Sequence, residues 1–149
     1  MYGSSGSLIR LHTSLSESEK AERQRIQAQL DRLLAPLSEG ELELLEGRHL
    51  IAVRNNPQFM AVSDAISDAL DEGDVPTTDP CWERSSFLGE QIMLPVVQKF
   101  VASLRPATRE QRSIATRHGV TLPAHCSSVE AGYILRQAIA AESRRPRKG

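Results

Sequence analysis

Hydrophobic residues recur along this chain at helical spacing, and the runs begin at residues that are typical of helix N-termini. Ser16 and Glu19 have the S-x-x-E spacing of a capping box, in which each side chain satisfies a backbone amide of the first turn. Apolar residues then repeat every three or four positions as far as Leu37. This pattern predicts a helix from about residue 17 to 35, with Pro36 helping to end it.

A second capping box at Ser38 and Glu41 predicts that another helix follows at once. We expect Gly47 to interrupt this helix. The apolar residues 49–53 fit a short strand as well as a resumed helix, because hydrophobic period does not separate the two at this length. We favour the helix, since no partner strand is apparent elsewhere in the sequence.

Two helix starts in the middle of the chain combine a capping side chain with a following proline. Asn56-Pro57 begins an apolar stripe that ends at Gly73. Asp79-Pro80 begins the most apolar segment of the chain, which we expect to form a central helix over residues 80–104.

A proline lies inside this central segment. Because Pro95 has no amide hydrogen, the carbonyl of Gln91 loses its helical partner. We therefore expect a kink or a break near residues 91–94.

The last third of the chain predicts two more helices. Thr108 and Gln111 form a T-x-x-Q capping box, and Gly119 is placed to end the helix that follows. Ser127 and Glu130 form another S-x-x-E box. Two small residues follow Glu130, and they would let the last helix approach a neighbour closely.

These elements predict an all-α fold, a single-domain bundle of five to seven helices around a Pro-kinked central helix. The first two helices would form an antiparallel hairpin against that helix. Aromatic residues make up only 4% of the 149 residues, which suits helix packing better than a β-sandwich. We expect a flexible N-terminus over 1–14, a helical domain over 15–143 with a basic two-helix submodule at 106–142, and a basic disordered tail at 144–149.

Positive charge is concentrated at the carboxyl end of the chain. Residues 105–149 contain nine Lys or Arg and three acidic residues, a net charge of +6, whereas residues 1–104 carry −7. Arginine predominates there, and its planar guanidinium suits bidentate contacts with phosphate. The candidate residues for contact with nucleic acid or a partner are Arg105, Arg109, Arg112, Arg117, Arg136, Arg144, Arg145, Arg147 and Lys148.

The kind of contact follows from what accompanies these arginines. Tyr133 is the only aromatic residue in this third of the chain, so phosphate contacts are expected rather than base stacking. Charge that only solvates the terminus is the alternative.

An acidic run offers a second candidate surface. Asp64, Asp68 and Asp71 fall on one face of the helix that begins at residue 57. Such a face is most often only solvated, but it can also receive a basic partner surface. The apolar segment around Trp82 and Phe87 belongs to the same alternative, in which the chain binds a protein without touching nucleic acid.

Enzyme signatures are absent from the sequence, which has no G-x-S-x-G elbow, no H-E-x-x-H motif and no Walker loop. We expect no enzymatic activity, no cofactor and no metal, because the histidines and cysteines lack metal-ligand spacing. A zinc site assembled from Cys81, His118, His125 and Cys126 is the less favoured alternative. An enzyme remains a third hypothesis, which requires His118, His125 and Cys126 to meet an acid in one pocket.

The cellular location is expected from the same composition. Two cysteines 45 positions apart favour reduced thiols in the cytoplasm. No apolar run approaches the ~18 residues that cross a bilayer, so we expect no membrane insertion.

The segment 106–140 contains three short motifs, Ala107-Thr108-x-x-Gln111, Gly119-x-x-Leu122-Pro123 and Ser127-x-x-Glu130-Ala131. This arrangement resembles a small helical module at the ends of plasmid-type topoisomerases and of short plasmid or phage proteins. The resemblance brings no catalytic residue, and nothing before residue 106 matches. It implies a protein that acts near mobile DNA.

We therefore expect a small non-catalytic accessory or regulatory protein of a mobile genetic element, whose Arg-rich C-terminal third contacts DNA or a DNA-bound protein. The alternative is an inhibitor or adaptor that docks on a larger complex, such as a conjugation or defence machinery. A homodimer stays open in both cases.

Overall fold

The structure is a computed structural model that describes residues 13–73 and 79–144. These two ranges contain six helices. They are α2 (Glu17–Leu34), α3 (Glu39–Arg54), α4 (Pro57–Glu72), α5 (Pro80–Ser103), α6 (Arg109–Arg117) and α7 (Ser128–Arg144). No β-strand occurs in these two ranges, which contain only an isolated bridge between Pro106 and Ser127. The prediction of an all-α single-domain bundle is confirmed.

Most helix ends lie where the sequence predicts them. Capping boxes begin α2, α3 and α6. The side chain of Asn56 caps α4 by accepting the Phe59 amide at 2.9 Å, and that of Asp79 caps α5 by accepting the Cys81 amide at 2.9 Å. Gly119 follows α6 with a φ of 66°, a conformation that glycine adopts at little cost.

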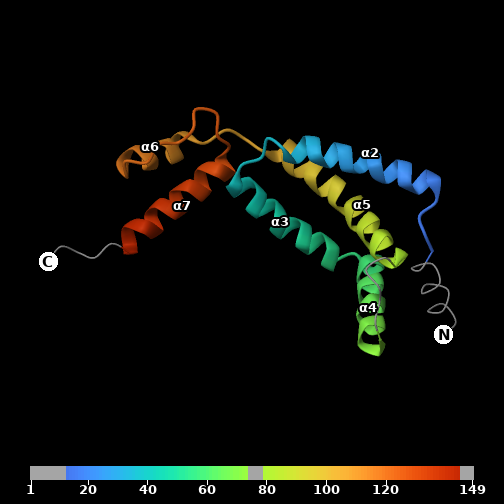
Figure 1. The fold of residues 1–149 in the computed structure, drawn as a ribbon. Helices are drawn as coiled ribbons and strands as arrows, with labels where there is room; N and C mark the ends of the chain where they lie inside the picture. Colours follow the sequence, from blue (N-terminus) through green and yellow to red (C-terminus); the bar gives the residue numbers. More distant parts are fainter. Residues whose placement is uncertain (1–12, 74–78, 145–149) are drawn as a thin grey trace.

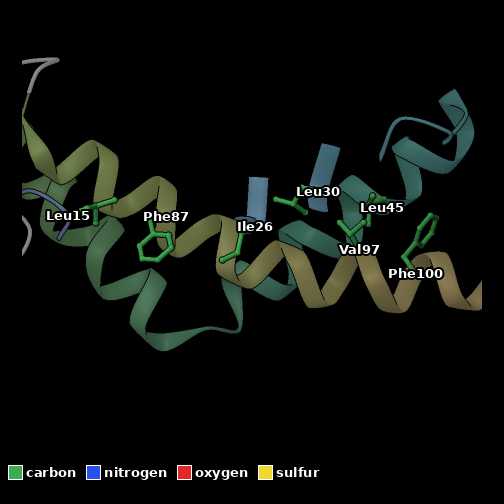
Figure 2. Close-up of a cluster of buried hydrophobic side chains, with 7 residues drawn as sticks. All are labelled: Leu15, Ile26, Leu30, Leu45, Phe87, Val97 and Phe100. Carbon is green, nitrogen blue, oxygen red and sulfur yellow. The ribbon is translucent and has the colours of Figure 1, made fainter. Parts of the chain in front are cut away.

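Helix α5 is the central element, since α2, α3 and α4 all pack on it (Figure 1). Its Val97 and Phe100 are 0% and 1% exposed. Figure 2 shows these two side chains in one cluster that joins α5 to α2 and α3, made of Leu15, Ile26, Leu30, Leu45, Phe87, Val97 and Phe100. Burial of an aromatic side chain such as Phe100 contributes about 2–3 kcal/mol to stability.

The predicted hairpin of the first two helices is only partly correct. Helices α2 and α3 each pack on α5 and hardly on each other, so α5 separates them (Figure 1). The physical reason is that α5 is apolar on more than one side, with Phe87 and Val97 buried and Leu94 and Val96 partly buried. Each of the two shorter helices therefore finds its own apolar surface on α5.

Neither Gly47 nor Pro95 breaks its helix. Helix α3 continues through Gly47 to Arg54, so residues 49–53 are helical and do not form a strand. Helix α5 runs through Pro95 without a break. Both Pro95 and Gln91 lie on the exposed side of α5, where water can hydrate the carbonyl that lacks a helical partner.

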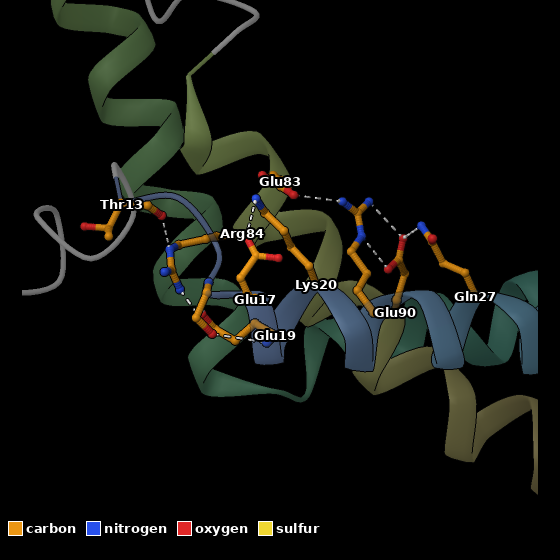
Figure 3. A network of polar contacts seen from close by, with 10 residues as sticks. Thr13, Glu17, Glu19, Lys20, Gln27, Glu83, Arg84 and Glu90 are labelled. Atoms are coloured by element: carbon orange, nitrogen blue, oxygen red, sulfur yellow. Dashed lines mark hydrogen bonds and ion pairs between the residues drawn. The ribbon is translucent and has the colours of Figure 1, made fainter.

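Charged side chains also join α2 to α5 (Figure 3). Arg23 binds Glu90 with two hydrogen bonds, from Nε to Oε2 at 2.9 Å and from Nη2 to Oε1 at 3.2 Å. Arg84 of α5 pairs with Glu19 at 3.4 Å and donates to the backbone carbonyls of Thr13 and Ser14. Bidentate pairs of this kind fix the relative position of two helices.

The two ends of the chain lie partly outside the described residues. Of the predicted flexible N-terminus, residues 1–12 lie outside the described residues, and only residues 13 and 14 are described. Arg144, which we assigned to a disordered tail, is the last residue of α7. Among the described helices, none has both the length and the apolar character that a bilayer crossing requires.

Candidate nucleic-acid interface

Helices α6 and α7 lie at one end of α5, and α4 lies at the other (Figure 1). The segment before α6 is tied to the segment before α7 by two backbone hydrogen bonds, from the Ala107 amide to the Cys126 carbonyl at 3.0 Å and from the Ser128 amide to the Arg105 carbonyl at 2.7 Å. Gln111 of α6 adds a side-chain bond to the Ser128 carbonyl at 2.9 Å. Because α6 and α7 also pack on each other, they form one unit.

This unit is joined to the core where the N-termini of α3 and α7 meet. The Glu130 carboxylate accepts the amide of Gly40 at 3.0 Å and the hydroxyl of Ser38. The Ser127 hydroxyl accepts the Glu130 amide at 3.1 Å, as in a capping box. The Glu130 side chain, however, binds the first turn of α3, so the predicted box becomes a link between two helices.

A close backbone approach accompanies this link. A Cβ atom placed on Gly40 would lie 2.4 Å from the Cβ of Tyr133, which is nearer than two such atoms can come. Gly40 is therefore the small residue that allows α7 to dock on α3. We expected the small residues Ala131 and Gly132 to serve this purpose. Ala131 is fully buried, whereas a Cβ on Gly132 would meet its nearest neighbour at an ordinary 3.7 Å.

Glu41 lies beside the same junction and is 8% exposed. Burial opposes its ionisation and is the largest single influence on its pKa. Hydrogen bonds from the Ser38 amide and from the Ser127 and Ser38 hydroxyls act in the opposite direction and together lower the pKa below its usual value. The Ser38 amide nitrogen and hydroxyl oxygen both lie 2.8 Å from its Oε1, and the Glu41 and Glu130 carboxylates share the one hydroxyl hydrogen. Glu41 is thus a buried, ionised group held by hydrogen-bond donors.

Helix α6 carries a basic face directed away from its packed side. Ala115 is buried on the inner side. Arg109, Arg112 and Arg117 recur at three and five positions, which places them within one exposed face of a helix. With Ser113 and Thr116, they line an open depression of about 470 Å³, and we call these five residues the α6 basic face.

The arginines of this face are not neutralised by the protein. Among residues 13–73 and 79–144, none of the three forms an ion pair. Within the same ranges, Arg23 and Arg84 of the core are paired, and the exposed Arg25 and Arg32 of α2 are not. Arg112 donates to the Ala124 carbonyl at 3.2 Å, which holds its side chain without removing its charge. Guanidinium groups that are exposed and unpaired remain available to an external anion.

The other predicted arginines are distributed around this unit. Arg105 donates to the carbonyls of Ala102 and Leu104 at 3.1 and 2.9 Å and so caps the end of α5. Arg136 and Arg144 are exposed on α7. The remaining candidates, Arg145, Arg147 and Lys148, lie outside the described residues.

Sequence reasoning missed two members of the α6 basic face, the hydroxyl residues Ser113 and Thr116. Each lies four positions after an arginine, and this spacing in the sequence could have placed it on the same helix face as the arginines. The Thr116 hydroxyl donates to the Arg112 carbonyl at 3.0 Å, so the Ser113 hydroxyl is the one that can donate to a phosphate beside the arginines.

The alternative acidic surface is present on α4, where Asp64, Asp68 and Asp71 are exposed. Trp82 does not extend it, since it is partly buried against Ile66 and Cys81. Phe87 is 6% exposed in the core and is therefore not part of a contact face.

The histidines and cysteines do not come together as the enzyme hypothesis requires. His125 and Cys126 line a pocket of about 550 Å³ with Glu41 and Glu130. His118, in contrast, caps α6 and lies 3.0 Å from Glu142 of α7. Over the described ranges, no group of three or more His, Cys, Asp or Glu side chains could hold a metal ion.

Cys81 is buried at the other end of α5. Burial, with a further contribution from the Asp79 carboxylate, raises the pKa of its thiol to about 11. The thiol is therefore protonated at neutral pH and is a poor nucleophile.

The chain was compared with family models, with curated proteins and with solved structures, and none of the three comparisons gives a match. Interpretation of the surface therefore depends on its geometry and charge.

Proposed function

We propose that this chain is a small cytoplasmic accessory or regulatory protein that contacts the phosphates of DNA, or of a DNA-bound complex, through the α6 basic face. The observation that carries the proposal is that Arg109, Arg112 and Arg117 share one exposed face and form no ion pair within the described chain. Arginines whose charge has no internal partner favour binding to a polyanion, because phosphate contact releases counterions.

The mode of contact follows from the residues present. Arginine and hydroxyl groups bind phosphate oxygens, which fixes a protein on the duplex without reading sequence. The described part of this unit offers a single aromatic residue, Tyr133, which is only partly exposed and packs against Gly40. We therefore propose nonspecific contact with the DNA backbone, and the resemblance of residues 106–140 to modules of plasmid-type topoisomerases supports a role near mobile DNA.

The direct test compares two double variants on a nonspecific DNA duplex at low salt, measured by fluorescence anisotropy. Arg109→Ala/Arg117→Ala removes two guanidiniums that form no hydrogen bond with the described protein, so the fold should remain. We expect its affinity to fall by at least about tenfold, because each lost contact with a charged group costs 1 kcal/mol or more. The matched control Arg25→Ala/Arg32→Ala removes two exposed arginines of α2 and should bind like the wild type. Equal affinities of the two variants, or no binding by the wild type, would contradict the proposal.

A second candidate function is the binding of a basic protein surface by α4. It is favoured by Asp64, Asp68 and Asp71, which are exposed on one side of the helix and have no cationic partner among the described residues. In this case the chain is an inhibitor or adaptor of a larger complex. Charge reversal at these three positions should then abolish capture of a partner while the α6 variant retains it.

A further inference from the structure

Helix α3 is apolar on two opposite sides. Leu45 and Val53 are buried on the side that faces the core, at 2% and 8% exposure. On the opposite side Leu44 and Ile51 are 40% and 60% exposed. Helix α7 covers this side only in the first turn of α3, at Gly40, so the apolar side chains that stay exposed further along it indicate a missing partner.

The exposed side has a regular spacing. Leu44, Gly47, Ile51 and Arg54 recur at three, four and three positions, which is the spacing of helices that pair along a narrow seam. A Cβ atom placed on Gly47 would meet no atom within 4 Å. The seam therefore contains an open hole at Gly47, one turn before its most exposed apolar side chain.

We propose that this seam is the contact between two copies of the chain, with α3 of each copy antiparallel to α3 of the other about a two-fold axis. Ile51 of each copy then inserts over Gly47 of its partner, and Leu44 packs on the aliphatic part of the partner's Arg54. A two-fold contact is self-complementary, so each of these interactions forms twice.

The charges along α3 favour a second copy in this orientation. Glu43 lies at the start of the seam and Arg54 at its end, and neither forms an ion pair within the described chain. Antiparallel pairing brings Arg54 of one copy beside Glu43 of the other. A parallel pair would place each of these charges beside its own kind, which is unfavourable.

The size of the seam determines the expected affinity. About three turns of helix bury less area than the ~800 Å² per partner of a standard stable interface. We therefore expect a reversible dimer that forms in the micromolar range and dissociates on dilution.

Sedimentation equilibrium on the full chain tests the surface, with protein from about 1 to 200 µM so that a micromolar dissociation constant is bracketed. The wild type should change from monomer to dimer over this range. Ile51→Asp should remain a monomer throughout, because dimerisation would bury an unpaired charge. The matched control Leu70→Asp changes an exposed leucine of α4 and should dimerise like the wild type. A wild type that remains monomeric, or an Ile51→Asp variant that dimerises normally, would overturn the proposal.

Oxidative cross-linking tests the orientation. In the Leu44→Cys/Arg54→Cys variant, the thiol at position 44 of one copy lies opposite the thiol at position 54 of the other. A covalent dimer should therefore form. Leu44→Cys alone should not cross-link, since the two thiols are about 15 Å apart along antiparallel helices. Native Cys81 and Cys126 are buried, and the wild type serves as the control for them. Efficient cross-linking of Leu44→Cys alone would indicate parallel helices and contradict the proposed register.

Discussion

The Glu130 carboxylate, in the first turn of α7, accepts the backbone amide of Gly40, in the first turn of α3, at 3.0 Å. The positive ends of two helix dipoles therefore meet at one carboxylate. This arrangement attaches the α6–α7 unit to the core at a fixed point. The α6 basic face is consequently held in place by the fold.

Removal of the Glu130 carboxylate should be costly. Glu130→Ala leaves the Gly40 amide and the Ser38 hydroxyl without this acceptor, and we expect a loss of about 2 kcal/mol in the free energy of unfolding. Urea denaturation measures this loss. Glu110→Ala, at an exposed position of the first turn of α6, is the control and should cost about 0.5 kcal/mol or less. Equal losses in the two variants would show that the contact between α3 and α7 contributes little.

Gly40→Ala should destabilise the protein, although alanine is the better helix former. The added methyl group would meet the Cβ of Tyr133 at 2.4 Å, so α7 must move away from α3. We expect a loss of about 1–3 kcal/mol in thermal or urea unfolding. Gly89→Ala places its methyl group 3.6 Å from Phe59, an ordinary contact, and should stabilise α5 by about 0.5–1 kcal/mol. A stabilised Gly40→Ala variant would refute the close approach.

The stability of the fold should fall in acid in a way that depends on Glu41. Its pKa is lower in the folded protein than its ordinary value, so the ionised carboxylate stabilises the fold. This contribution is complete above the ordinary glutamate pKa of about 4.3 and is lost as the pH falls through the folded value. Urea unfolding between about pH 6 and pH 3 should therefore show a shallower decline for Glu41→Gln than for the wild type. Parallel curves for the two proteins would contradict this role of Glu41.

His49 should be replaceable with a gain in stability. Its Nε2 atom is buried and has no hydrogen-bond partner. An unsatisfied buried polar atom costs about 1–3 kcal/mol, whereas a leucine of similar size has none. We expect His49→Leu to raise the free energy of unfolding by about 1 kcal/mol, while His125→Leu, at an exposed position, should change it by less than about 0.5 kcal/mol. A destabilised His49→Leu variant would contradict this prediction.

The helices could be predicted from the sequence because their signals are local. Capping boxes at Ser16, Ser38 and Thr108 fixed three N-termini, since the side chain and the amide that it satisfies lie three residues apart. The expected interruption at Gly47 was wrong because local propensity does not include the packing of α3 on α5. At Pro95 the helix does not break, because the carbonyl of Gln91 lies on the exposed side of α5.

The candidate site was predictable only in part. Charge content alone indicated a basic surface, and Arg109, Arg112 and Arg117 could be assigned to one helix. The capping box at Ser127 was expected to close on itself, but Glu130 binds α3 instead. A contact between residues 90 positions apart depends on the tertiary arrangement, and no local pattern indicates it.

The salt dependence of DNA binding tests the central claim most directly. For a nonspecific duplex, the logarithm of the association constant should fall linearly with the logarithm of the salt concentration. The Arg109→Ala/Arg117→Ala variant should have a slope smaller by about 2, because each phosphate contact contributes about 0.9, whereas Arg25→Ala/Arg32→Ala should retain the wild-type slope. Identical slopes for the wild type and the α6 variant, or no association of the wild type even at low salt, would contradict the assignment of the α6 basic face as a phosphate-binding surface.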